Sequence, residues 1–257
     1  MNFIKYSIII AIGFVFIVLP VSAVFAADPH PIPESSLLQG GQAYFNSANY
    51  QSTIQSSDSL SRLAQTQSPI GGDAAAYGFA AKSDEAKFFI IGALYSEALA
   101  HLRGDNLQLA AERLEAIENQ FVAIQAPSAL YNFIIKVHSR VALGKYPSET
   151  LMDMLSFFQP FFEAYAQDLS QDKLILFRAG SWLVDMSLTA AADNRDLIRQ
   201  AKPQLAYFTK EMKRMDAPKG VLEAYGNINE IADKEDVSDK DVQKVLKQVK
   251  KIQTILG

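Results

Sequence analysis

Apolar residues recur three and four positions apart along almost the whole chain after Ser35, and hardly any stretch alternates with a period of two. This spacing puts the apolar side chains of a segment on one face of an α-helix, whereas a half-buried strand needs strict alternation. One such stripe begins behind Ser83, a typical N-cap residue, and stops at Gly104. The sequence therefore predicts an all-α fold.

Turn residues divide the stripes into antiparallel helical hairpins. We expect Asp105 to cap the second helix of one hairpin, residues 126–128 to end it, and Gly144 to end the helix that follows. Apolar stripes keep their phase across Pro160 and Pro203, which favours kinked helices over breaks at both prolines.

The later helices are also predicted by clear sequence signals. A strongly apolar segment predicts a helix over 171–191, and a further helix is expected near 219–233. In the last helix Ser238 and Asp241 resemble a capping box, with aspartate in place of glutamate. This helix carries a basic face, made of Lys240, Lys244, Lys247 and Lys251. Either the helix packs on its neighbour and leaves this face solvated, or the face is a contact surface for a partner or a membrane.

The N-terminus has the layout of a secretory signal. Lys5 precedes an uncharged run over residues 6–19, Pro20 breaks the helix, and Val24-Phe25-Ala26 supplies a cleavage site after Ala26. This pattern predicts a periplasmic or secreted protein. The alternative is an uncleaved anchor, because about 20 apolar residues can span a bilayer, and only then would the protein be attached to the membrane.

The segments that follow predict a simple domain organisation. Residues 27–34 contain three prolines and form an expected disordered leader, and residues 35–257 form one all-helical domain. Residues 65–82, which include Pro69 and a Gly71-Gly72 pair, are the expected loop or linker within it.

Composition excludes several classes of function. The chain has no cysteine, which rules out disulfides, thiolate metal sites, haem attachment through C-x-x-C-H and a lipid-modified N-terminal cysteine. A formal charge of −4 gives no electrostatic reason to expect nucleic acid as a partner.

The histidines and carboxylates predict neither a metal site nor a catalytic one. His30 lies in the leader. Cleavage after Ala26 makes it the fourth residue, too far along for an amino-terminal metal chelate, and cleavage after Ala27 puts Pro29, which has no N–H, at the second position. Glu97 and His101 stand four residues apart, a spacing typical of a surface contact, and His138 is expected to be a hydrogen-bonded structural residue. No nucleophile elbow, zinc-protease, phosphate-binding or dinucleotide motif occurs. We therefore expect a protein that is not an enzyme and takes no cofactor.

Three stretches suggest an internal repeat. They run over residues 41–44, 102–105 and 143–146, each a glycine-containing turn with Tyr or Asp beside it that joins two helices. They resemble the centre of a tetratricopeptide repeat, and the resemblance covers roughly residues 36–160. The family implies a solenoid of stacked hairpins. The residues themselves are equally compatible with an irregular helical bundle.

Aromatic residues mark the candidate binding region. Five of them fall within nine residues of one helix, more than a single buried face can hold, so part of the cluster could form an apolar groove or an interface. The candidate binding residues are Phe157, Phe158, Phe161, Phe162 and Tyr165, together with Tyr131 and Trp182. The alternative is burial of the whole cluster between two layers of helices.

Together these patterns predict an exported, non-catalytic interaction or scaffold module of the bacterial envelope that binds a peptide or a partner helix. The alternative is a periplasmic helical carrier whose aromatic residues enclose a small apolar ligand or lipid.

Overall fold

The computed structural model describes residues 84–256, and within them the chain forms α-helices and no strands. The all-α prediction is therefore confirmed for this part. The expected signal (1–26), the leader (27–34) and the loop over 65–82 lie outside the described residues, as does the repeat-like stretch over 41–44.

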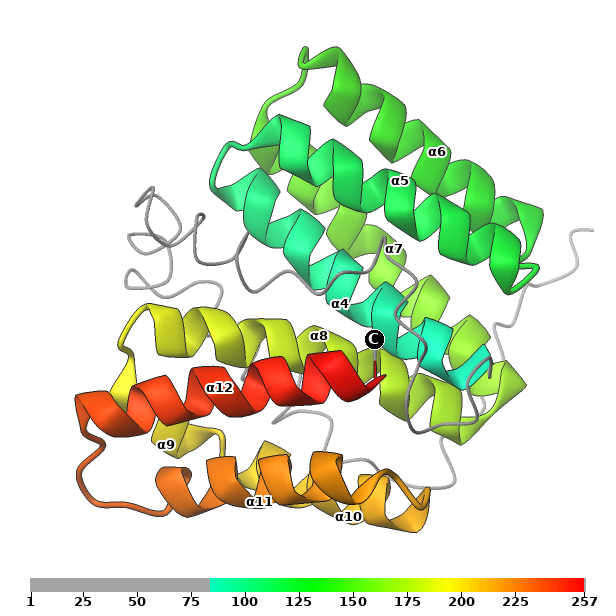
Figure 1. The fold of residues 1–257 in the computed structure, drawn as a ribbon. Coiled ribbons are helices and arrows are strands. Elements are labelled where there is room, and N and C mark those ends of the chain that lie inside the picture. Colours follow the sequence, from blue (N-terminus) through cyan, green and yellow to red (C-terminus); the bar gives the residue numbers. More distant parts are fainter. Residues whose placement is uncertain (1–83, 257) are drawn as a thin grey trace, which may run out of the picture. The chain divides into compact units, whose positions relative to one another are not determined.

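The first half of the described chain is a four-helix bundle (Figure 1). Its members are α4 (Asp84–Arg103), α5 (Leu107–Ala123), α6 (Ser128–Leu143) and α7 (Ser148–Leu169). Helices α4 and α6 each pack against both α5 and α7, which closes the bundle. We call these helices the first bundle.

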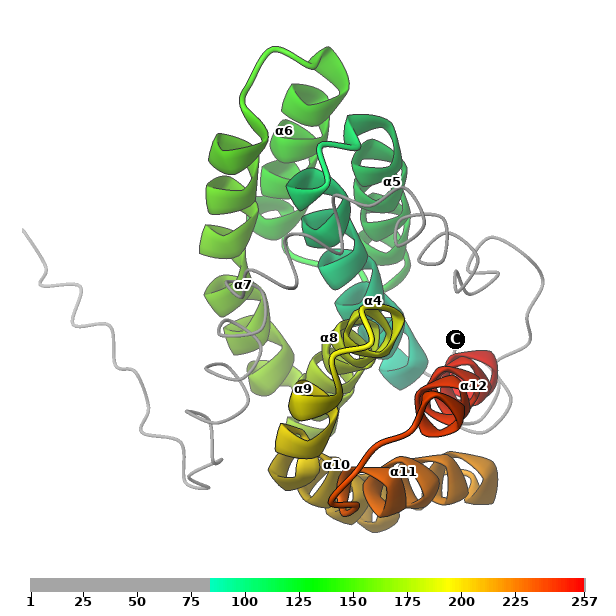
Figure 2. The same ribbon diagram turned by 90° about the vertical axis from the view of Figure 1, so that its left-hand side faces the viewer.

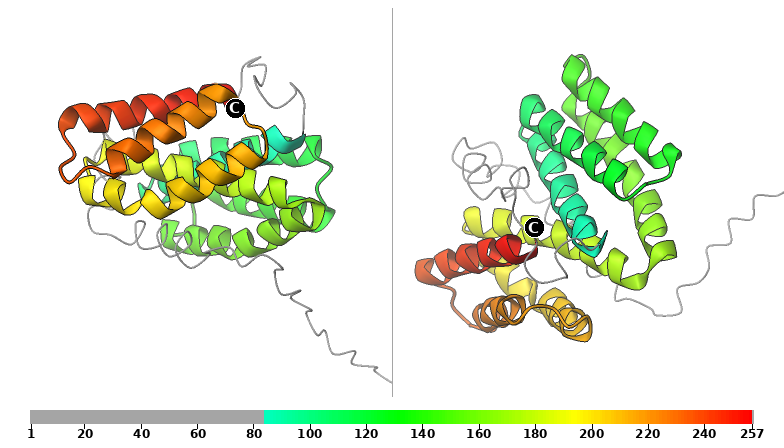
Figure 3. Two further views of the ribbon diagram at one scale, coloured as in Figure 1. Left: turned by 90° about the horizontal axis from the view of Figure 1, so that it is seen from below. Right: turned by 45° about the vertical axis from the view of Figure 1, so that its right-hand side comes forward.

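The second half repeats this arrangement with one helix divided in two, as Figures 2 and 3 show from other sides. It contains α8 (Gln171–Ala191), α9 (Arg195–Gln200), α10 (Lys202–Arg214), α11 (Lys219–Ala232) and α12 (Asp239–Leu256). Helix α8 packs against α9, α10 and α12, and α11 packs against the same three helices. These helices form the second bundle.

Helix α8 lies at the centre of the molecule's described part. It contacts α4 and α7 of the first bundle and α9, α10 and α12 of the second bundle. Among the described residues it is the one helix long and apolar enough to cross a membrane, and 72% of its apolar window is buried within the protein. Burial of this kind is expected for a core helix enclosed by two bundles.

The two bundles meet where α4 and α8 cross at two glycines. A Cβ atom on Gly92 would lie 1.9 Å from the carbonyl oxygen of Phe177, and one on Gly180 would lie 2.0 Å from the carbonyl oxygen of Phe89. Each helix thus presses its glycine against the backbone of the other. Only a residue without a side chain permits this approach.

The crossing continues along both helices in the same direction. The Lys173 ammonium lies 5.4 Å from the centre of the Phe88 ring, and the Ser96 and Ser181 hydroxyls are 2.5 Å apart. Together with the contact between Gly92 and Phe177, these pairs advance by four residues at each step, so the i,i+4 ridge of one helix lies along that of the other.

The reciprocal contact reveals an internal duplication. Phe89 and Gly92 lie 88 positions before Phe177 and Gly180. Gly92 therefore contacts the counterpart of Phe89, and Gly180 contacts the counterpart of Phe177. Contacts of this type are typical of an interface between two equivalent units. Here the two equivalent units are the two bundles of one chain.

The turns after the first helix of each bundle support the same relation. Asp105 and Asp193 have left-handed backbone conformations, with φ of 57° and 54°. The residues that follow, Asn106 and Asn194, each cap the next helix by accepting a hydrogen bond, at 3.1 Å, from the backbone N–H three residues further on. The expectation that Asp105 caps this helix was wrong, because its left-handed turn passes that role to Asn106.

The second turn is also repeated, but at a spacing of 91. Pro127 and Pro218 directly precede α6 and α11, with φ of −53° and −51° and ψ of 139° at both. The increase from 88 to 91 puts three additional residues into the second bundle between these turns. They fall where α9 ends and α10 begins, near Pro203. The expected kink at Pro203 is therefore a break between two helices.

Pro160, in contrast, lies inside a continuous helix, as expected. Its surroundings are held by two polar contacts with the neighbouring helices. The Tyr95 hydroxyl on α4 donates to the Leu155 carbonyl at 3.0 Å, and the Arg178 guanidinium on α8 donates to the Glu163 carboxylate at 2.5 and 3.0 Å. Helix α7 is thus fixed to both central helices around its proline.

The predicted caps at Gly144 and Ser238 are confirmed, and the one at Ser83 lies outside the described residues. Gly144 ends α6 in the left-handed conformation, with φ of 61°. Before α12, the Ser238 backbone N–H donates to the Asp241 carboxylate at 3.1 Å, and the Asp241 N–H donates to the Ser238 hydroxyl at 3.3 Å. This is the reciprocal pair of a capping box.

The glycine crossing can be tested by substitution. Gly92→Ala or Gly180→Ala would place a methyl group against a backbone oxygen that cannot move alone, so we expect a loss of about 3 kcal/mol or more in the free energy of unfolding, the upper end of overpacking costs. Urea unfolding followed by circular dichroism measures this loss.

Gly226→Ala in α11 is the matched control, because nothing lies within 4 Å of its added Cβ. Alanine is the better helix former, so this variant should gain about 0.5–1 kcal/mol. Equal effects at Gly92 and Gly226 would contradict the close crossing.

Candidate functional site

The predicted aromatic cluster on α7 is divided by the helix into a buried and an exposed part. Phe158 and Phe162 are buried, with Phe158 stacked on Phe133 at 5.1 Å and Phe162 stacked on Phe121 at 5.2 Å between ring centres. They belong to the core of the first bundle, so they offer no binding surface.

Phe157 and Phe161 lie on the outer face of the same helix. Their side chains are 65% and 54% exposed, and their ring centres are 5.2 Å apart. The division follows from helix geometry, since each successive residue is rotated by about 100° and the pair one turn apart shares a face. We call these two residues the α7 aromatic pair.

The remaining candidates do not join this pair. Tyr131 and Tyr165 are half-buried on α6 and α7. Trp182 lies in the second bundle, where it packs against Phe208 and Tyr225 with ring centres 5.4 and 5.9 Å apart. The seven predicted residues therefore do not form one site.

The internal duplication provides a reference for the α7 aromatic pair. Five of the six buried residues of α7 have a buried counterpart in α12 at a spacing of 90, as Phe162 has in Ile252. At that spacing the counterparts of Phe157 and Phe161 are Lys247 and Lys251, which belong to the predicted basic face. The fold accepts lysine at these positions, so packing does not account for two exposed phenylalanines.

Charge also distinguishes the two faces. Helix α7 contains no lysine or arginine, and its exposed carboxylates Glu149, Asp153 and Asp168 lie on either side of the aromatic pair along the helix. The outer face of α7 is therefore apolar at its centre and acidic towards its ends.

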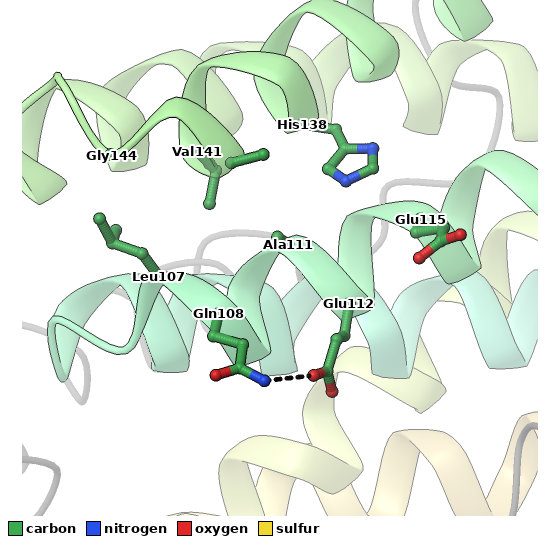
Figure 4. Close-up of a pocket in the computed structure, with 9 residues that line it drawn as sticks. Leu107, Gln108, Ala111, Glu112, Glu115, His138, Val141 and Gly144 are labelled. Atoms are coloured by element: carbon green, nitrogen blue, oxygen red, sulfur yellow. Dashed lines mark hydrogen bonds between the residues drawn. The ribbon is translucent and has the colours of Figure 1, made fainter.

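A second surface feature lies between α5 and α6. It is an open groove of about 390 Å³, shown in Figure 4, and its apolar lining comes from Leu107, Ala111 and Val141. Glu112 and Glu115 add carboxylates to one wall, and Glu112 accepts a hydrogen bond from the Gln108 amide at 3.3 Å. We call it the α5–α6 groove.

His138 also lines this groove, and it is hydrogen-bonded as the sequence predicts. Its Nδ1 atom lies 2.7 Å from a carboxylate oxygen of Glu118 on α5. The contact joins α5 to α6 next to the groove.

Glu97 and His101 lie in the interior, so the expectation of a surface contact between them was wrong. Their exposed fractions are 2% and 0%, and Glu97 accepts a hydrogen bond from the Arg113 guanidinium at 2.6 Å. Burial raises the pKa of Glu97, although Arg113 opposes this shift. Within residues 84–256 both ring nitrogens of His101 lack a hydrogen-bond partner.

Burial and the nearby positive charge of Arg113 lower the pKa of His101 to about 4. The imidazole is therefore neutral at physiological pH, enclosed within the first bundle and out of reach of a solvent-borne substrate. Within the described part of the chain, no group of three or more His, Asp or Glu side chains is placed to hold a metal ion.

Comparison with known proteins adds no relatives: the chain matches no family model, no curated protein and no solved structure. The resemblance to tetratricopeptide repeats stays a prediction.

The buried histidine predicts a specific pH dependence. Between pH 7 and pH 4 the unfolded chain binds a proton at His101 while the folded protein does not, so this residue makes unfolding easier as the pH falls. From pH 7 to pH 4 we expect the wild type to lose up to about 3 kcal/mol of unfolding free energy relative to His101→Met.

Urea unfolding of both proteins at several pH values measures that difference. Glu97 is present in both proteins, so its opposing titration largely cancels. A difference that stays constant from pH 7 to pH 4 would show that His101 is not buried in its neutral form.

Proposed function

We propose that this protein is an exported, non-catalytic interaction module that binds an apolar helical segment of an envelope partner through the α7 aromatic pair. The observation that carries the proposal is the exposure of Phe157 and Phe161 at positions where the second bundle has Lys247 and Lys251. The cysteine-free composition and the N-terminal signal pattern support export.

The aromatic pair has the properties of an interface centre. Phenylalanine rings bury a large apolar area, and aromatic residues are enriched in the core of protein interfaces. On α7 the rings stand on a rigid helix, which Tyr95 and Glu163 connect to the central helices. Such an anchor loses little conformational freedom when a partner covers it.

The carboxylates around the pair indicate the charge of the partner. Glu149, Asp153 and Asp168 are exposed, and α7 has no cation to balance them. A partner helix with apolar residues at its centre and lysine or arginine at its ends would complement this face. The carrier alternative has less support, because the α5–α6 groove has carboxylates in its wall.

A photocrosslinking experiment in cells that export the protein tests this proposal. Replacement of Phe157 by p-benzoylphenylalanine keeps an aromatic ring at the site and should give a crosslinked product of one defined mass. The crosslinked partner peptide should contain apolar residues together with lysine or arginine. The same probe at Val122, which is 62% exposed on α5, is the matched control and should not give this product.

Phe161→Ser in the same protein removes the second ring and should abolish the crosslink at position 157. Because Phe161 is exposed, the substitution should change the unfolding free energy by no more than about 0.5 kcal/mol. If position 157 gives no product of its own, or if Phe161→Ser leaves the product unchanged, the aromatic pair is not the binding surface.

A further inference from the structure

The second bundle shows what the α5–α6 groove of the first bundle lacks. At the spacing of 88 the counterparts of Leu107 and Ala111 are Arg195 and Arg199, at the start of the second helix in each bundle. The groove is therefore open at the place where the second bundle has two arginine side chains.

Both arginines connect their helix to the loop before α12. The Arg199 guanidinium donates to the Glu235 carbonyl at 2.8 Å and to the Asp196 carboxylate at 2.7 Å. Arg195 donates to the Val237 carbonyl at 2.9 Å and bridges Asp193 and Asp239. Each guanidinium thus bridges a backbone carbonyl and at least one carboxylate.

The first bundle replaces one of these bridges by a direct bond. Asp105 is the counterpart of Asp193, and it accepts a hydrogen bond from the Ser148 hydroxyl at 2.5 Å. Ser148 is the first residue of α7, as Asp239 is the first residue of α12. This bond connects the turn after α4 to the start of α7, so the first bundle needs no counterpart of Arg195 there. For Arg199 the first bundle has only the methyl group of Ala111, which lines the groove.

The chemistry of a guanidinium site is nevertheless present in the groove. Gly144 lies in the loop after α6, as Glu235 lies in the loop after α11, and it lines the groove together with the Glu112 and Glu115 carboxylates. Leu107 and Val141 form an apolar surface on which the aliphatic stem of an arginine can lie.

From this correspondence we infer that the α5–α6 groove binds an arginine side chain of a partner polypeptide. The arginine takes the place that Arg199 fills in the second bundle. Gln108 stands at the counterpart of Asp196, the carboxylate that Arg199 contacts, so the arginine in the groove pairs instead with Glu112, which lines it. Arginine is favoured over lysine because Arg199 uses two separate nitrogens on two acceptors, which a planar guanidinium can do and a single ammonium does less well. The site is distinct from the α7 aromatic pair.

A titration with short blocked peptides tests this inference. The probe is acetyl-Ala-Arg-Ala-amide added to the full chain, observed by NMR of the labelled methyl groups of Leu107, Ala111 and Val141. We expect saturable shifts of these three groups. The peptide with citrulline in place of arginine has nearly the same shape without the charge, and it should bind at least about tenfold more weakly.

Ala111→Arg is the decisive variant, because it gives the first bundle the side chain that the second bundle already has. We expect this variant to fold and to bind the arginine peptide at least about tenfold more weakly, since its own guanidinium fills the groove. Glu112→Gln, a surface change that keeps the fold, should weaken binding to a similar extent and decides the question if Ala111→Arg does not fold.

Phe161→Ser is the control for the other surface and should leave peptide binding unchanged. A loss of crosslinking at Phe157 with intact peptide binding would therefore overturn the proposed function alone. Equal binding of the citrulline peptide, or unchanged arginine binding in Ala111→Arg or Glu112→Gln, would overturn the groove assignment.

Discussion

The glycine contact between α4 and α8 is the constraint on which the described structure depends. Gly92 and Gly180 let the two backbones approach so closely that each added Cβ would meet a carbonyl oxygen of the opposite helix. Each helix is also the first of its bundle and packs against the second and the last helix of that bundle, the second being α9 and α10 together in the second bundle. The close approach of the two bundles at this crossing therefore depends on two residues that have no side chain. The hydroxyl contact between Ser96 and Ser181 extends this crossing by a further turn.

The duplication makes each bundle a reference for the other. Where counterparts agree, as for Asn106 and Asn194, the residue is explained by the fold they share. Where they differ at the surface, the fold does not require the difference, and another cause must be sought. Two such differences, the α7 aromatic pair and the open α5–α6 groove, lie in the first bundle. The second bundle has lysine and arginine at the corresponding places, so both proposed binding surfaces lie in the first bundle.

Much of the helical framework could be predicted from the sequence, because it depends on local signals. The apolar helix over 171–191, the stop at Gly144 and the capping box at Ser238 are all present. The aromatic cluster was identified, but which rings face outward depends on the neighbours of α7. Glu97 and His101 could not be placed, since their burial results from helices distant in sequence. The repeated Phe-x-x-Gly segments at Phe89 and Phe177 were the signal that could have revealed the duplication.

The three additional residues between α9 and α10 have a consequence for the two surfaces. Three residues advance a helix by about 300°, some 60° short of a full turn, and lengthen it by about 4.5 Å. The buried residues nevertheless keep a helical spacing across the break at Ala201, since Ile198, Ala201 and Leu205 lie three and four residues apart. Arg199 lies two residues before the break, on a short helix that is separate from α10. In the first bundle α5 is one continuous helix, so the residues that line the groove and the residues that face the core lie on the same helix. Any change in helix phase that alters one of them must alter the other.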